Sequence, residues 1–224
     1  MDRRIYRYSP CPELRNVLLP AYAPCHHFEG NCRGIARWDP SAGHVPRGFV
    51  GAIGGLDEVE LVLLPAEPGD PLPGEAHSGK DPADYIERCC EKVYQHFEEP
   101  ATLYHRNVRK ILDACFPSHG FAEQMRKAWI VEAYLCSAPT EGGNVPATSW
   151  RTCARDYLVP QLEILRDRAI VALGRKAQQR VRAFDGPVLV AGAVSPPGCN
   201  LAAVRESWDA IPDYVASTGR KRQL

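Results

Sequence analysis

The sequence predicts an α/β fold: a single domain with a mainly parallel central sheet flanked by helices on both faces. Short apolar runs that fit buried strands alternate with stretches of helical periodicity. The chain has 224 residues, 45% of them hydrophobic, which is enough for one sizeable core. A sheet of this kind brings the loops that follow its parallel strands to one edge, where ligands bind in open α/β folds.

Four segments are predicted as strands because they are short, apolar and partly β-branched: residues 59–64, 129–136, 169–174 and 188–191. The predicted helices cover residues 81–97, 108–116, 151–165, 176–184 and 202–210. Asp81 followed by Pro82 is typical of a helix start, with a capping side chain and a first-turn proline. Residues 1–55 are rich in Pro, Gly, Cys and His, so we expect an irregular segment packed on the single domain of residues 1–224.

Charge and hydropathy narrow the classes of function. Lys+Arg and Asp+Glu both total 27, so DNA contacts would have to come from local basic patches. No run of about 18 apolar residues occurs, and the first residues, Met1-Asp2-Arg3-Arg4, lead into no apolar signal segment. We expect a cytoplasmic, monomeric protein without membrane contact. The basic tail of residues 219–222 is expected to stay solvated.

Three loops after predicted strands carry unusual motifs. They read Pro65-Ala66-Glu67-Pro68-Gly69, then Cys136-Ser137-Ala138-Pro139 with Asn144, Pro146 and Cys153, and finally Ala193-Val194-Ser195-Pro196. Together with residues 157–165 and 170–177, their order and spacing resemble the uracil-DNA glycosylase superfamily, closest to its iron-sulfur branch. The resemblance covers about residues 59–205 and implies the α/β/α sandwich of that superfamily.

The resemblance implies a base excision repair enzyme that flips uracil out of DNA and hydrolyses its N-glycosidic bond, leaving an abasic site. Its partner would be DNA that contains uracil or abasic sites. Glu67 stands where the family orients water, and an oxocarbenium-like sugar needs a carboxylate there. Asp70 and His77 are further catalytic candidates. In the alternative interpretation, Glu67 caps its turn, Asp70 is a turn residue and His77 is a solvated loop residue.

Two departures from the family pattern concern the base. Glu132 stands at or near the position of an Asn that reads the uracil edge, unless its side chain faces elsewhere. A carboxylate there would repel the charge that develops on uracil unless it is protonated. Ala193 replaces a histidine, and losing one such donor typically costs about 100- to 1000-fold in rate. These departures keep a second function open, namely a glycosylase-like module that binds DNA or abasic sites without turnover.

The remaining site residues are carried over from the family motifs. We expect the substrate to contact Ala66, Pro68, Gly69, Glu132 and Ser195. The candidate DNA contacts are Ser195, Pro196, Pro197, Leu201, Arg205 and Arg175. Leu201 would fill the stack that the flipped base leaves. For Ser195 to Pro197 the alternative is a plain proline-rich turn, and for the arginines a solvated charge or a helix-dipole partner.

The cysteines raise the question of a cofactor. Their number, nine, is odd, and the chain has no signal segment, which argues against a disulfide framework. The resemblance implies a 4Fe-4S cluster held by Cys25, Cys32, Cys136 and Cys153. The spacing between Cys25 and Cys32 is wider than in the family, and Cys11 is an alternative ligand. Zinc in the same ligands and unligated buried thiols are the other two interpretations.

Overall fold

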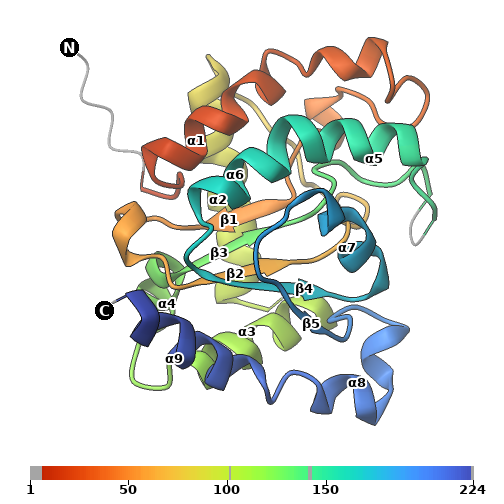
Figure 1. Ribbon diagram of the computed structural model, residues 1–224. Helices are drawn as coiled ribbons and strands as arrows, with labels where there is room; N and C mark the ends of the chain where they lie inside the picture. The colour runs from red at the N-terminus through yellow and green to blue at the C-terminus, as the bar shows by residue number, and fades with distance from the viewer. Residues whose placement is uncertain (1–6, 101, 141–142, 223–224) are drawn as a thin grey trace.

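A five-stranded sheet forms the centre of the protein in the computed structural model, which describes residues 7–100, 102–140 and 143–222 (Figure 1). Its strands are β1 (Phe49–Gly51), β2 (Leu61–Leu64), β3 (Ala128–Val131), β4 (Ala169–Leu173) and β5 (Leu189–Ala191). The spatial order is β1-β3-β2-β4-β5. Strands β2 to β5 are parallel to their neighbours, and β1 adds an antiparallel edge to β3.

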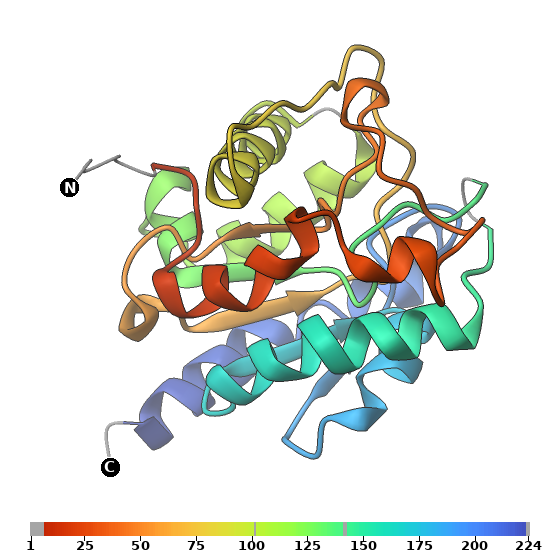
Figure 2. The same cartoon turned by 90° about the horizontal axis from the view of Figure 1, so that it is seen from above.

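Both faces of the sheet are covered because its central strands are apolar at every position. In β2, Val62 and Leu64 point into one core while Leu61 and Leu63 point into the other, as the alternation of a strand requires. The first core is closed by α1 (Pro12–Leu18), α5 (Ala147–Cys153), α6 (Val159–Ile164) and α7 (Arg175–Arg180). The second is closed by α3 (Leu103–Cys115), α4 (Phe121–Lys127) and α9 (Ile211–Arg222). Figure 2 shows these two layers from above.

Two further helices join these layers to the edges of the sheet. Helix α2 (Pro82–Glu98) packs beside β1 and contributes to both cores. It begins as predicted, because the Asp81 side chain accepts a hydrogen bond from the backbone of Asp84 at 2.9 Å. Helix α8 (Ala202–Glu206) follows the loop after β5. None of the helices in the described part of the chain combines the length and apolarity that a membrane span requires.

A widened π-helical turn, Ala154–Leu158, joins α5 to α6 in one continuous helix. It lies directly before Pro160, which has no N–H to donate to the helical ladder. Short 3-10 turns make up most of the other regular structure: Leu19–Tyr22, His26–Glu29, Pro40–Ala42, Leu56–Glu58, Val181–Ala183 and Gly198–Asn200.

The prediction of a mainly parallel sheet with helices on both faces is confirmed. Residues 1–55 are less irregular than expected, because they contain α1 and β1. The second predicted strand ends at Val131 and does not reach Cys136. Helices α4 and α9 were not predicted. The basic tail belongs to α9, and its residues 220–222 are exposed as expected, although Arg222 also donates a 3.1 Å hydrogen bond to the carbonyl of Val59.

Candidate functional site

The candidate site lies where the connections of the sheet diverge, between β2 and β4. From β2 the chain crosses to β3 on one side, and from β4 it continues to β5 on the other. A crevice forms at the carboxyl ends of strands at such a switch point. The loop after β3 closes onto the loop after β2, because the backbones of Ala133 and Tyr134 donate 3.0 Å hydrogen bonds to Pro65 and Ala66. The strand ends therefore meet at one edge.

Glu67 occupies this edge and is bonded to the helix that follows β4. Its Oε1 lies 2.5 Å from Nζ of Lys176, and its Oε2 forms an ion pair with the guanidinium of Arg180. Arg180 also donates a 2.6 Å hydrogen bond to the carbonyl of Ala66. The side chain of Arg180 is 3% exposed and that of Lys176 is 40% exposed. Glu67 thus bonds from the loop after β2 to helix α7, with one buried and one accessible cation, and it does not merely cap its own turn.

Arg47 holds in place the rest of the loop that follows β2. Its guanidinium bonds to the carbonyl of Gly69, donates to Oγ of Ser137 at 3.0 Å and lies 3.3 Å from Glu75. Ser137 donates to the same Gly69 carbonyl at 2.8 Å. The Glu75 carboxylate in turn accepts a 2.7 Å hydrogen bond from the backbone of Leu72. This buried network fixes the course of the loop that carries Glu67.

Glu132 comes directly after β3 and is 6% exposed. Its backbone N–H donates to Gly48 at 2.6 Å, and a Cβ at Gly48 would lie only 2.9 Å from that of Glu132. Burial raises the pKa of the Glu132 carboxyl to about 8, against the attraction of Arg47, and the neighbouring Glu67 raises it further. The Tyr104 hydroxyl interacts with the same carboxyl. Glu132 is therefore mainly protonated at neutral pH, and it lies close enough to Arg47, Glu67 and Arg180 for their charges to act on it.

The loop after β5 reaches the site through Gly174, at the start of α7. Gly174 has a φ of +93°, and a Cβ there would lie 2.9 Å from the Cβ of Ala193. This close approach requires glycine and brings Ala193 against the helix that carries Lys176. Asn107 of α3 donates a 2.9 Å hydrogen bond to the Val194 carbonyl and fixes the loop from the other side. Ala193 offers no side-chain donor at this position.

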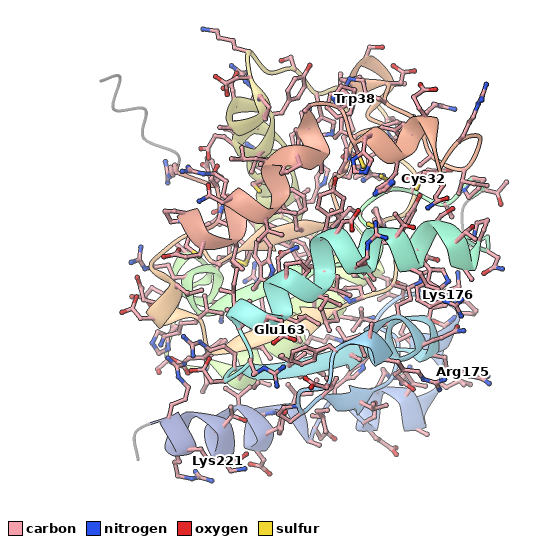
Figure 3. All side chains as sticks on the ribbon, turned by 45° about the horizontal axis from the view of Figure 1, so that its top comes forward. Cys32, Trp38, Glu163, Arg175, Lys176 and Lys221 are labelled. Atoms are coloured by element: carbon pink, nitrogen blue, oxygen red, sulfur yellow. The ribbon has the colours of Figure 1, made fainter. Side chains whose placement is uncertain are left out.

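The predicted DNA contacts lie at or near the surface of this last loop and of α7. Ser195, Pro196 and Pro197 are exposed, and Leu201 is 64% exposed. Arg175 is exposed beside Lys176 at the start of α7 (Figure 3). One nitrogen of Arg205 bonds to the carbonyls of Cys199 and Asn200 at 2.8 and 2.9 Å, so this arginine supports its own loop.

Two catalytic candidates are not brought to Glu67. Asp70 is exposed, and no hydrogen bond or ion pair within the described residues joins its side chain to another residue. The His77 side chain is fully buried, with Nε2 3.4 Å from the Glu75 carboxylate, so the prediction of a solvated histidine is wrong. Its neighbours are Glu75 and Arg47, which support the loop. The structure thus assigns His77 to the packing beneath the site.

Arg180, Arg47 and Tyr104 are site residues that the sequence analysis missed. Arg180 lies four residues after Lys176 on α7, a spacing that puts both on one helical face. This four-residue spacing is the sequence feature from which Arg180 could have been identified. Arg47 and Tyr104 come from segments far away in the sequence, and only the tertiary fold brings them to Glu75 and Glu132.

The four cysteines predicted as cluster ligands, Cys25, Cys32, Cys136 and Cys153, line one small cavity. The hydroxyl of Tyr134 lies 3.5 Å from Sγ of Cys32, and that of Tyr157 lies 3.3 Å from Sγ of Cys25. Burial raises the pKa of the Cys153 thiol to about 12 and that of Cys136 well above its ordinary value. The alternative ligand, Cys11, lies outside the lining and bonds through its backbone to Ala52.

The spacing of these thiols bears on whether all four could share one metal ion. Four sulfurs around one tetrahedral zinc, each about 2.3 Å from the metal, are about 3.8 Å apart. Among the described residues, no three of the cysteine sulfurs lie within 4.8 Å of one another. In an iron-sulfur cluster each thiolate binds its own iron, so the sulfurs sit farther apart. The four thiols as placed therefore do not match one tetrahedral zinc ion, and their spacing leaves both an iron-sulfur cluster and unligated buried thiols open.

Comparison with protein-family models and with curated protein sequences gives no match.

Proposed function

We propose that this protein is a monofunctional uracil-DNA glycosylase with the α/β/α sandwich of that superfamily. The observation that carries the proposal is Glu67, a largely buried carboxylate fixed at the switch-point crevice by Lys176 and Arg180. Carboxylates at such strand ends are well placed for catalysis because the surrounding loops can enclose a ligand. Motif order, strand-end placement and the cysteine-lined cavity support the same proposal. We expect a cytoplasmic monomer that acts in base excision repair.

The reaction requires a carboxylate beside the sugar. As the N-glycosidic bond breaks, its electron pair leaves with uracil and the sugar acquires oxocarbenium character. Glu67 would stabilise that positive charge and orient a water whose oxygen bonds to the anomeric carbon. The proton released by the water neutralises the departing uracil anion, so the products are an abasic site and uracil. Arg180, held by the Ala66 carbonyl, would keep the carboxylate aimed.

Glu132 would read the base. A neutral carboxyl group offers one donor and one acceptor, and these match a carbonyl and the neighbouring N–H of uracil. Because the pKa of Glu132 is raised to about 8, the group adds no negative charge that would oppose the departing uracil at neutral pH. Raising the pH above that value would remove the donor.

The exposed residues at the end of the sheet would hold the DNA. Arg175 and Lys176 can contact phosphate, and Ser195 to Pro197 can press on the backbone. Leu201 is one of the two large apolar side chains most exposed in the described part of the chain, which suits a residue that enters a base stack. Base flipping costs a few kcal/mol, and such a wedge offsets part of that cost.

A 4Fe-4S cluster would be held by Cys25, Cys32, Cys136 and Cys153. When bound, it would act as a redox-capable cross-link between the N-terminal segment and the chain after β3. We expect protein purified without oxygen to absorb visible light and to contain about four irons per chain. The Cys136→Ser variant should lose both the visible absorbance and the iron. The Cys115→Ser variant should keep both, because Cys115 lies outside the cavity. A colourless, iron-free wild type would contradict this part of the proposal.

A second function, DNA binding without turnover, is favoured by one observation. Ala193 has no side-chain donor, and Glu67 is already engaged by two cations. A protein with these features would bind uracil-containing or abasic DNA but would release no uracil from it.

One experiment separates the two functions. The protein is incubated with an oligonucleotide that contains one uracil, and alkali is then added. Strand cleavage supports the glycosylase, while a retarded band without cleavage supports the binding module. Asp70→Asn is the matched control for Glu67→Gln, because Asp70 belongs to the same loop but is exposed.

A further inference from the structure

A group of metal-ligating side chains lies beside the cysteine-lined cavity and has no role in the proposed glycosylase site. It consists of His26, His27 and Asp156, whose ligand atoms all lie within 4.8 Å of one another. Nε2 of His27 is 2.6 Å from Oδ2 of Asp156, and the two imidazole ring centres are 3.7 Å apart. Within the described residues, no other set of three His, Cys, Asp or Glu ligands is this close.

The backbone around these side chains is fixed by other bonds. Asn31 donates a 2.8 Å hydrogen bond to Thr152, and Ser149 donates a 2.6 Å hydrogen bond to the Asn31 carbonyl. These contacts dock the histidine segment on α5. Asp156 lies on the π-helical turn, a rare geometry that often marks functional sites. The ligands are therefore held close together without any metal.

The two sides of this group differ in accessibility. The side chain of His27 is 10% exposed and that of Asp156 is 24% exposed, whereas His26 is exposed. His26 also lines an open surface pocket that includes Phe28, Arg33 and Trp38. A bound ion would thus have protein ligands on its inner side and room for water on its outer side.

We propose that His26, His27 and Asp156 bind a divalent transition-metal ion. Two imidazoles and one carboxylate form a donor set that suits zinc or ferrous iron, and three protein ligands leave a position for water. The ion would connect the His26–Glu29 turn to the π-helical turn. His27 also lines the cysteine cavity, but the three ligands include none of the cysteines and none of the glycosylase residues, so the proposal stands or fails independently of the proposed function.

Arginines oppose a cation at this place: Arg33 and Arg37 line the pocket beside His26, and the ligand Asp156 is paired with Arg155. The guanidinium of Arg155 bonds to Asp156 at 2.5 and 3.0 Å, but its side chain is 70% exposed. An exposed ion pair of this kind contributes little stability, so the arginine can move aside. Removing its charge should tighten metal binding.

Crystals of the protein soaked in Zn²⁺ test the proposal, with anomalous scattering recorded at the zinc edge. We expect a peak about 2.0–2.2 Å from His26, His27 and Asp156. The position of the peak separates this site from the cysteine cavity. A peak at the cysteines alone, or no peak, overturns the proposal.

Calorimetric titration of Zn²⁺ into the protein as isolated provides the solution test. His26→Ala and Asp156→Asn should each weaken binding more than about 10-fold, a loss that even outer-shell changes can cause. Arg155→Ala should strengthen it, and His119→Ala, far from the site in sequence, should leave it unchanged. Asp156→Asn keeps an acceptor for His27, which preserves the fold. Equal affinities in all four variants would overturn the proposal.

Discussion

Two glutamates follow neighbouring strands of the same sheet, and their surroundings give them opposite properties. Glu67, after β2, is paired with Lys176 and Arg180. Glu132, after β3, is buried, and within the described residues no cation lies at ion-pair distance from it. Burial therefore raises the pKa of Glu132 to about 8, whereas the Glu67 carboxylate has two cationic side chains as direct partners.

The difference shows how one strand edge can supply both a charge and a neutral hydrogen-bonding group. Two carboxyl groups in such different surroundings often take different roles in catalysis. In the proposed reaction the carboxylate faces the cationic sugar and the neutral carboxyl faces the base. A protein with a neutral group at position 67 and a charged group at position 132 should not excise uracil.

The largest expected effect is on excision. Glu67→Gln should lower the rate of uracil release about 100- to 10,000-fold, the range typical of a lost catalytic carboxylate. Glu132→Gln should retain most of the wild-type rate at pH 7, because an amide also provides one donor and one acceptor. Single-turnover assays of both variants measure the contrast. Equal losses in the two would show that the glutamates do not differ in role.

The next effect concerns the buried cation. Arg180→Met should destabilise the fold by about 3–5 kcal/mol, because it leaves Glu67 with only the accessible Lys176. Urea unfolding measures this change. Arg175→Met is the matched control, since Arg175 is exposed on the same helix, and it should stay within about 0.5 kcal/mol of wild type. Similar unfolding midpoints for the two variants would contradict the account.

The third effect should depend on pH. The native pKa of Glu132 is about 8, against an ordinary value of 4.5, so the folded state binds more protons between these values. Wild-type stability should therefore fall as pH rises through this window, relative to Glu132→Gln. The variant should be more stable by about 3–5 kcal/mol at pH 8 and equal below pH 4.5. A pH-independent difference would show that Glu132 does not titrate in this window.

The smallest effect tests the neighbour of Glu132. The hydrogen bond of the Tyr104 hydroxyl favours the charged carboxylate, so Tyr104→Phe should move the pH-dependent loss of stability to higher pH. The lost hydrogen bond should also cost about 1 kcal/mol at neutral pH. Denaturant unfolding across the pH range measures both. A shift to lower pH would mean that the hydroxyl interacts mainly with the neutral form.

Much of the sheet was predictable because its strands are short, continuous apolar runs. Glu67 was found because a strand-end loop directs its residues towards the crevice. The pairing of Glu67 with Arg180 could not be predicted, because it depends on β2 and β4 being neighbours in the sheet. Helix α9 was missed because only Ile211 and Val215 are buried along it, which leaves a weak period in the sequence.

The states of individual side chains were the least predictable part of the site. A loop histidine and a strand-end glutamate look equally polar in the sequence, yet His77 and Glu132 are both buried. Their burial depends on Arg47 and Gly48, from a segment whose composition predicted irregular structure. Local sequence does not specify such long-range packing.

The release of free uracil tests the central claim most directly. Wild-type protein is incubated with a uracil-containing oligonucleotide, and uracil and abasic sites are quantified by mass spectrometry. The account predicts equal amounts of both from the wild type and from Asp70→Asn, and almost none from Glu67→Gln. Wild-type protein that binds the oligonucleotide but leaves its uracil attached would contradict it.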